Sequence, residues 1–179
     1  MIQFTLDTSS STPTVQQLND AIEKGIKWVQ LPANYNYTEE ELNEIENICR
    51  DNEIILTVTD DVNLLERRKF HGILFTPEKE SVSLIRNELG AHPIIGIEID
   101  CNKNNWQNHT SDDIDYITID IDKYDFVKVK NVFTKIRANW DIRIVARVSN
   151  VTNDGIQNLL QQGFDGIDIK NHKNLMLMS

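Results

Sequence analysis

Charged and polar side chains stand at or just after the ends of several apolar segments of this chain, where the pattern predicts β-strands. The residues that share this placement are Asp7, Gln30, Asp60, Glu98, Asp100, Asp120, Arg147 and Lys170. If the segments are parallel strands of one sheet, these side chains meet at one end of it. Several carboxylates within a few ångströms cannot all stay ionised unless a cation or a basic side chain neutralises them. The chemistry of this end therefore depends on what neutralises the acids.

The sequence leaves three arrangements open. The first is an internal network of ion pairs, formed by Glu98, Asp120, Arg147, Asp168 and Lys170. The second is a divalent cation on Asp60 with Glu98, Asp100 or Asp120, because hard cations take clustered carboxylates. Asp60 and Asp100 are its candidate ligands. The third is a catalytic site with a carboxylate as general base and a basic side chain that binds a substrate anion. Its candidate catalytic residues are Glu98, Asp120, Arg147 and Lys170.

Eight short segments have the composition of β-strands, and helix-like segments fill most of the gaps between them. The strand segments are Gln3–Asp7, Lys27–Pro32, Ile54–Asp60, Gly72–Pro77, Ile94–Asp100, Tyr116–Asp122, Arg143–Ser149 and Gly166–Asn171. Alternating strands and helices indicate a parallel α/β protein, and eight strands is the number that closes a (β/α)8 TIM barrel. A doubly wound open sheet is the alternative, but strands buried on both faces are usually apolar throughout.

The predicted strands are apolar on one face only. In the sixth segment Ile117, Ile119 and Ile121 share one face, and Thr118, Asp120 and Asp122 lie on the other. In a barrel the face under the helices must be apolar, whereas the lumen accepts polar groups that pair with one another. The pattern therefore favours the barrel and places Thr118 and Asp120 in the lumen.

The composition is that of a soluble globular protein, and we expect one domain over residues 1–179. A net charge of −10 and a pI of about 4.8 argue against binding to nucleic acid or to an anionic membrane. The first residues, MIQFTLDTSSS, lack the basic flank and apolar core of a signal peptide, so we expect a cytoplasmic protein. Cys49 and Cys101 predict neither a disulfide framework nor a zinc site.

The chain is short for a TIM barrel, which usually has about 250 residues. The shortage falls in the fifth helix, where Cys101–Asp113 is polar and Asn-rich, and after the eighth strand, where only HKNLMLMS remains. A missing or stubby eighth helix would uncover the apolar strand face at Ile167 and Ile169. The segment Leu175–Met178 or a second subunit would have to cover it, and we expect a homodimer that buries this region.

Six short pieces of sequence, taken in order, resemble the thiamine phosphate synthase and TenI-like family from about Gly25 to Asn171. The pieces are Val29–Asn34 (VQLPAN), Val58–Asn63 (VTDDVN), Gly72–Phe75 (GILF), Ile94–Glu98 (IIGIE), Asp115–Ile117 (DYI) and Gln162–Ile167 (QGFDGI). The resemblance implies a TIM barrel and a magnesium-dependent transferase of thiamine biosynthesis, which joins a pyrimidine pyrophosphate to a thiazole phosphate. It further implies that Gln30 and Thr59 contact a bound small molecule and that Asp60 holds the magnesium.

The chain departs from the family at the positions that would bind phosphate. Pro32 and Asn34 stand where the family has an arginine and a lysine, and the second magnesium aspartate falls near Glu78 or Lys79 without an equivalent. Further exchanges place Glu98 for a serine, Asp120-Ile121 for Gly-Pro, and Val148-Ser149 for two glycines whose N–H groups would cradle a phosphate. The loss of cations and the gain of acids would repel a pyrophosphate ester. We therefore expect a diverged member that lacks the condensation and binds an unidentified small molecule or acts as a regulatory protein. An active thiamine phosphate synthase is the alternative.

Overall fold

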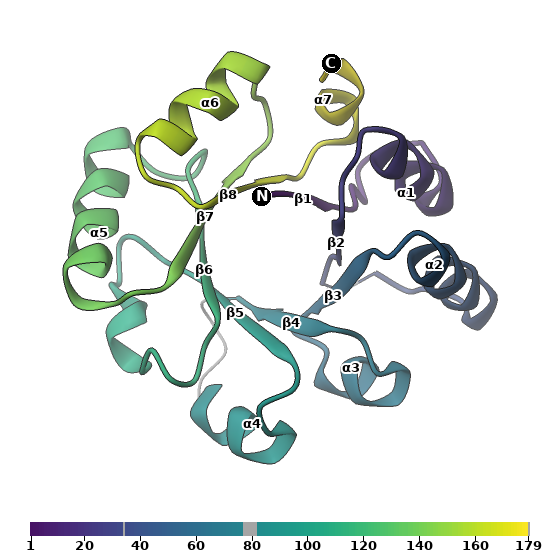
Figure 1. Ribbon diagram of the computed structural model, residues 1–179, viewed down its shortest axis with the longest axis horizontal. Helices are drawn as coiled ribbons and strands as arrows, with labels where there is room; N and C mark the ends of the chain where they lie inside the picture. The colour runs from purple at the N-terminus through teal and green to yellow at the C-terminus, as the bar shows by residue number, and fades with distance from the viewer. Residues whose placement is uncertain (34, 77–81, 179) are drawn as a thin grey trace.

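The structure of the protein, a computed structural model, describes residues 1–33, 35–76 and 82–178. Within these residues eight parallel strands form a closed barrel in chain order, with β8 hydrogen-bonded to β1 (Figure 1). The strands are β1 Ile2–Thr5, β2 Trp28–Leu31, β3 Ile55–Thr59, β4 Gly72–Phe75, β5 Ile94–Glu98, β6 Tyr116–Asp120, β7 Arg143–Val148 and β8 Gly166–Ile169. The predicted TIM barrel is confirmed.

Helices surround the barrel on the outside (Figure 1). Those in the described part of the chain are α1 Thr14–Glu23, α2 Glu39–Asp51, α3 Val62–Arg68, α4 Val82–Leu89, α5 Phe126–Asn139, α6 Asn153–Gln161 and α7 His172–Leu177. Several begin at a side chain that caps the first turn; the Thr38 hydroxyl, for example, accepts a hydrogen bond from the Glu41 N–H at 3.1 Å. None of the helices in the described residues is long and apolar enough to cross a membrane.

The two faces of the strands divide the side chains as the sequence pattern predicts. In β6, Ile117 and Ile119 are fully buried in the hydrophobic layer under the helices. Thr118 and Asp120 are also buried, but they lie on the opposite face of the strand, which points into the lumen. Each isoleucine that leaves water in this way contributes roughly 1.5–3 kcal/mol. This burial outside the strands stabilises a barrel whose interior is polar at one end.

The lumen is filled by apolar side chains toward the N-terminal ends of the strands. Trp28, Leu74, Tyr116 and Val145 form a separate hydrophobic cluster there. The Trp28 and Tyr116 rings meet edge to face, with their centroids 5.3 Å apart. Gly96 leaves room for the tyrosine, because a Cβ at that position would lie 2.2 Å from Tyr116 Cζ. The chemistry of the lumen is therefore confined to the opposite end, where the strands finish.

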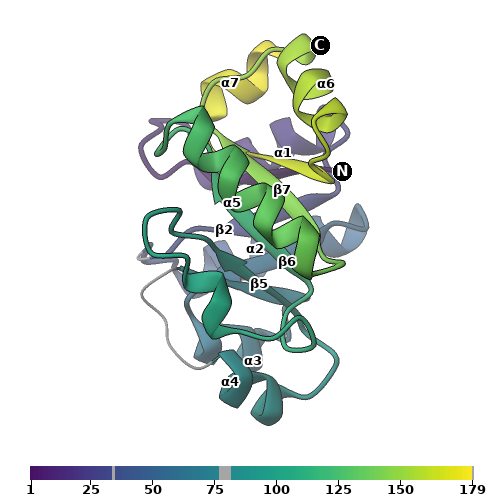
Figure 2. The ribbon, with the colours of Figure 1, turned by 90° about the vertical axis from the view of Figure 1, so that its left-hand side faces the viewer.

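The connections that the sequence predicts to be weak are indeed reduced. Between β5 and β6 the chain forms only a 3₁₀ helix, η1, over Asn105–Asn108. After β8 comes the six-residue helix α7, which packs against β8 and α1 (Figure 2). Leu175 is fully buried there, and so are Ile167 and Ile169. This short helix therefore helps to cover the apolar face of β8, whose cover the sequence does not decide.

The strands end earlier than their sequence patterns suggest. β5 ends at Glu98 and β6 at Asp120, so Asp100 and Asp122 lie in the loops that follow. Asp60 likewise follows β3 in a left-handed backbone conformation, with φ 58°. The alternation continues into these loops because polar residues also favour turns. Pro77, the predicted end of the fourth strand, lies outside the described residues.

Candidate functional site

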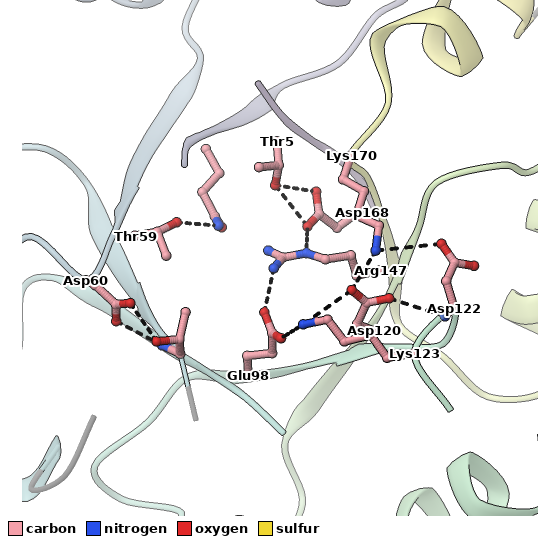
Figure 3. Close-up of polar contacts among 12 residues, drawn as sticks. Thr5, Thr59, Asp60, Glu98, Asp120, Asp122, Lys123, Arg147, Asp168 and Lys170 are labelled. Carbon is pink, nitrogen blue, oxygen red and sulfur yellow. Dashed lines mark hydrogen bonds and ion pairs between the residues drawn. The ribbon is translucent and has the colours of Figure 1, made fainter. Parts of the chain in front are cut away.

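The candidate site lies at the mouth of the barrel, which comprises the C-terminal ends of the strands and the loops after them. Its centre is Arg147, which points inward from β7 (Figure 3). Arg147 Nε donates to Asp168 Oδ2 at 2.6 Å, and Nη1 donates to Glu98 Oε2 at 2.6 Å. The parallel register makes the first contact possible, because it sets Arg147 directly beside Asp168 on β8. The Thr5 hydroxyl donates to the same aspartate at 2.9 Å.

The arginine is held in its charged form inside the barrel. Burial alone would lower the pKa of Arg147, but the adjacent carboxylates of Asp168 and Glu98 raise it above its ordinary value. Both carboxylates are buried as well. Charges taken out of water in this way are tolerated only when they are paired and hydrogen-bonded. The third guanidinium nitrogen, Nη2, is buried and has no hydrogen-bond partner among the described residues.

Two lysines extend these contacts toward solvent. Lys123 Nζ is 2.7 Å from Glu98 Oε1 and 3.7 Å from Asp120 Oδ2. Lys170 Nζ is 2.6 Å from the same oxygen of Asp120 (Figure 3). Burial alone would lower the pKa of Lys123, but its hydrogen bond to Glu98 and the Glu98 charge raise it. We call this set the ion-pair network; its members are Glu98, Asp120, Lys123, Arg147, Asp168 and Lys170.

The loop after β6 adds a further carboxylate at the edge of the network. Asp122 Oδ2 accepts a hydrogen bond from the backbone N–H of Ser149 at 2.6 Å and lies 3.7 Å from Lys170 Nζ. The Asp122 N–H in turn donates to Asp120 Oδ1 at 3.2 Å. The first residue after β7 and the first after β8 are thus both in contact with one aspartate from the loop after β6.

Gln30 and Thr59, the predicted small-molecule contacts, lie on another side of the lumen and bond to each other. Gln30 Nε2 donates to Thr59 Oγ1 at 2.9 Å, and the Thr59 hydroxyl donates to the Leu31 carbonyl. Gln3 Nε2 donates to Gln30 Oε1 at 2.9 Å. At the far end of this series of hydrogen bonds, Gln3 Oε1 is buried and has no hydrogen-bond partner among the described residues. An uncharged relay of amides and a hydroxyl therefore faces the charged network.

Asp60 and Asp100, the predicted metal ligands, each have partners outside the network. Both Asp60 carboxylate oxygens accept bonds from Thr76, one from its N–H at 2.9 Å and one from its hydroxyl at 2.6 Å. Asp100 Oδ1 accepts bonds from the Asn102 N–H and the Tyr124 hydroxyl. Among the described residues no group of three or more His, Cys, Asp or Glu side chains is placed to hold an ion. Glu78 and Lys79 lie outside the described residues, and a magnesium site at Asp60 and Asp100 stays a prediction.

Sequence reasoning thus places the four candidate catalytic residues together, in the geometry of the first of its three alternatives. It misses Lys123, and it places Asp122 on the polar face of the sixth strand without naming it as a site residue; both lie in the loop after β6. The sequence gives one indication for Lys123, which is its position three residues after Asp120. At that spacing its ammonium group lies 3.7 Å from the Asp120 carboxylate.

Comparison with known proteins agrees with this fold. The profile of the family described as thiamine monophosphate synthase, TMP-TENI, matches residues 3–120. A search of curated proteins found no match. The solved structure of thiamine phosphate pyrophosphorylase from Pyrococcus furiosus is 18% identical, with a TM-score of 0.75 over 98% of this chain and 91% of that one.

Other barrels are similar in fold at still lower identity. An HpcH/HpaI aldolase from Desulfitobacterium hafniense is 9% identical, with a TM-score of 0.73 over 95% of this chain and 85% of that one. The N-acetylmannosamine-6-phosphate 2-epimerase from Clostridium perfringens is 11% identical, with a TM-score of 0.66 over 96% and 88%. At these identities the likeness shows the fold alone, whereas the profile covers more than half of the sequence. The chain belongs to the thiamine monophosphate synthase/TenI family.

Proposed function

We propose that this chain is a diverged TenI-like barrel that binds a small molecule at its mouth or acts as a regulatory protein. In this proposal it lacks the pyrophosphate-dependent condensation that the family name describes. The observation that carries the proposal is that the cationic side chains at the mouth are already paired with carboxylates. Arg147, Lys123 and Lys170 are each bonded to carboxylates of the ion-pair network. A pyrophosphate ester would have to break these pairs and would leave buried carboxylates unpaired, which costs several kcal/mol.

Unsatisfied polar atoms in the lumen support binding of an uncharged polar molecule. Arg147 Nη2, Gln3 Oε1 and Thr118 Oγ1 are buried and lack hydrogen-bond partners among the described residues. A buried polar atom without a partner costs about 1–3 kcal/mol. Nη2 only donates and Gln3 Oε1 only accepts, so a hydroxyl or amide group satisfies this set better than an anion.

A direct assay tests the loss of the condensation. The purified chain is incubated with magnesium, hydroxymethylpyrimidine pyrophosphate and thiazole phosphate, and thiamine phosphate is measured by chromatography. The Pyrococcus furiosus thiamine phosphate pyrophosphorylase is the positive control. We expect no product above the protein-free blank. Product formation that depends on magnesium and on both substrates would refute the proposal.

An active synthase is the second candidate, and the profile match over residues 3–120 favours it. In that case Gln30 and Thr59 contact the substrate and Asp60 holds magnesium. Calorimetry with magnesium, manganese and calcium separates the two candidates further, with Asp60→Asn as the matched variant. An active synthase predicts heat with magnesium that this substitution abolishes. Under the leading proposal, magnesium gives the same small signal with both proteins.

A further inference from the structure

Asp122 occupies a position at the mouth where many TIM barrels bind a phosphate group. In this fold the phosphate site is frequently built from the loops after strands 7 and 8. Here the donors from those loops are the Ser149 N–H, directly after β7, and Lys170 Nζ, directly after β8. Both face one oxygen, Asp122 Oδ2: the Ser149 nitrogen lies 2.6 Å from it and Lys170 Nζ lies 3.7 Å from it. Figure 3 shows the contact with Lys170. Backbone N–H groups and lysine side chains are both donors that proteins use to bind phosphate.

The contact does more than neutralise the lysine. Lys170 is already paired with Asp120 at 2.6 Å, so its charge is balanced without Asp122. The loop that carries Asp122 is fixed, because its backbone N–H donates to Asp120 Oδ1. The second carboxylate therefore adds a net negative charge at this point and also uses the N–H donor. An incoming anion meets both an occupied donor and a like charge.

We propose that Asp122 is an internal substitute for a ligand phosphate and that it makes the mouth select molecules without a phosphate group. The inference deepens the proposed function by naming the class of ligand, and it rests on that function only in assuming that the mouth binds a ligand. It assigns to Asp122, which the sequence comparison passes over, the role of a specificity-determining residue. Removal of its side chain frees the Ser149 N–H and leaves Lys170 with a single carboxylate partner.

The test measures binding of inorganic phosphate by calorimetry at constant ionic strength, with sodium chloride as the balancing salt. Three variants are compared with the wild type. Asp122→Ala removes the charge and the acceptor, and Asp122→Asn removes the charge but keeps a carbonyl oxygen for the Ser149 N–H. Asp112→Asn is the matched control, because this exposed residue lies before β6, at the other end of that strand, and its loss changes the net charge equally.

We expect the wild type and Asp112→Asn to bind phosphate weakly, and Asp122→Ala to bind it about tenfold or more tightly than the wild type does, the effect of one nearby like charge at the surface. Asp122→Asn should gain less than Asp122→Ala. Two results would overturn the inference: wild-type binding as tight as that of Asp122→Ala, or equal gains in Asp122→Ala and Asp112→Asn. The substitutions alter a partly exposed loop side chain, and thermal unfolding of each variant checks its fold. The condensation assay uses the wild type with organic substrates, so it can fail or succeed independently of this comparison.

Discussion

At the scale of single residues, the guanidinium of Arg147 joins carboxylates from strands that are far apart in the sequence. Glu98 comes from β5 and Asp168 from β8, and both carboxylates are buried. Buried ion pairs are weak evidence for net stability, because desolvation offsets much of the attraction. Removal of one partner is strongly destabilising, however, because it leaves an unpaired charge buried in the interior.

We therefore expect Arg147→Met to lower the free energy of unfolding by about 3–5 kcal/mol, because it leaves Asp168 buried without its cation and Glu98 paired with Lys123 alone. Urea denaturation followed by circular dichroism measures the change. Lys103→Gln is the control: Lys103 is exposed, its nitrogen is 3.7 Å from Asp100, and its loss should cost less than about 0.5 kcal/mol. If Arg147→Met were as stable as the control, the network would contribute little to the fold.

At the scale of elements, the strand alternation predicts which face of each strand a residue occupies but not which residues meet across the lumen. Contacts such as Arg147 with Asp168 depend on the register between β7 and β8, and no local pattern encodes it. Lys123 and the contacts of Asp122 escape prediction for a related reason, because a loop after a strand has no fixed period. The fold and the residues of the lumen could thus be predicted, and the ion-pair network is one of three alternatives, whereas the choice among them and the individual contacts depend on the register.

The short helix α7 offers a matched test of how the barrel is closed. Leu175 is fully buried against the barrel, whereas Leu177, two residues later, is 76% exposed. We expect Leu175→Ala to lower the free energy of unfolding by about 2–5 kcal/mol, through lost burial and the cavity left behind. Leu177→Ala should change it by no more than about 0.5 kcal/mol. Equal effects in thermal or urea unfolding would mean that α7 does not cover β8 in solution.

At the scale of the whole molecule, the predicted homodimer has a narrower basis than the sequence suggests. The apolar strand face at Ile167 and Ile169 is covered within the chain. Met176 and Leu177 remain exposed on α7, at 44% and 76%. A dimer at this end would have to bury these two side chains, so it stays a prediction centred on α7.

Light scattering coupled to size-exclusion chromatography tests the dimer. At tens of micromolar we expect twice the mass of one 20.7 kDa chain for the wild type. Leu177→Glu should elute as a monomer, because it places a charge in the expected interface while leaving the buried Leu175 untouched. Leu84→Glu is the control, since Leu84 is also exposed but lies on α4. A monomeric wild type would contradict the predicted homodimer.

The packing of Tyr116 over Gly96 has a consequence for sequences related to this one. A side chain at position 96 would occupy the space of the tyrosine ring, so the two positions cannot vary independently. Relatives with this register should pair glycine at 96 with an aromatic residue at 116, or a larger residue at 96 with a smaller one at 116. Covariation between strands β5 and β6 would then record, across a family, the filling of one lumen.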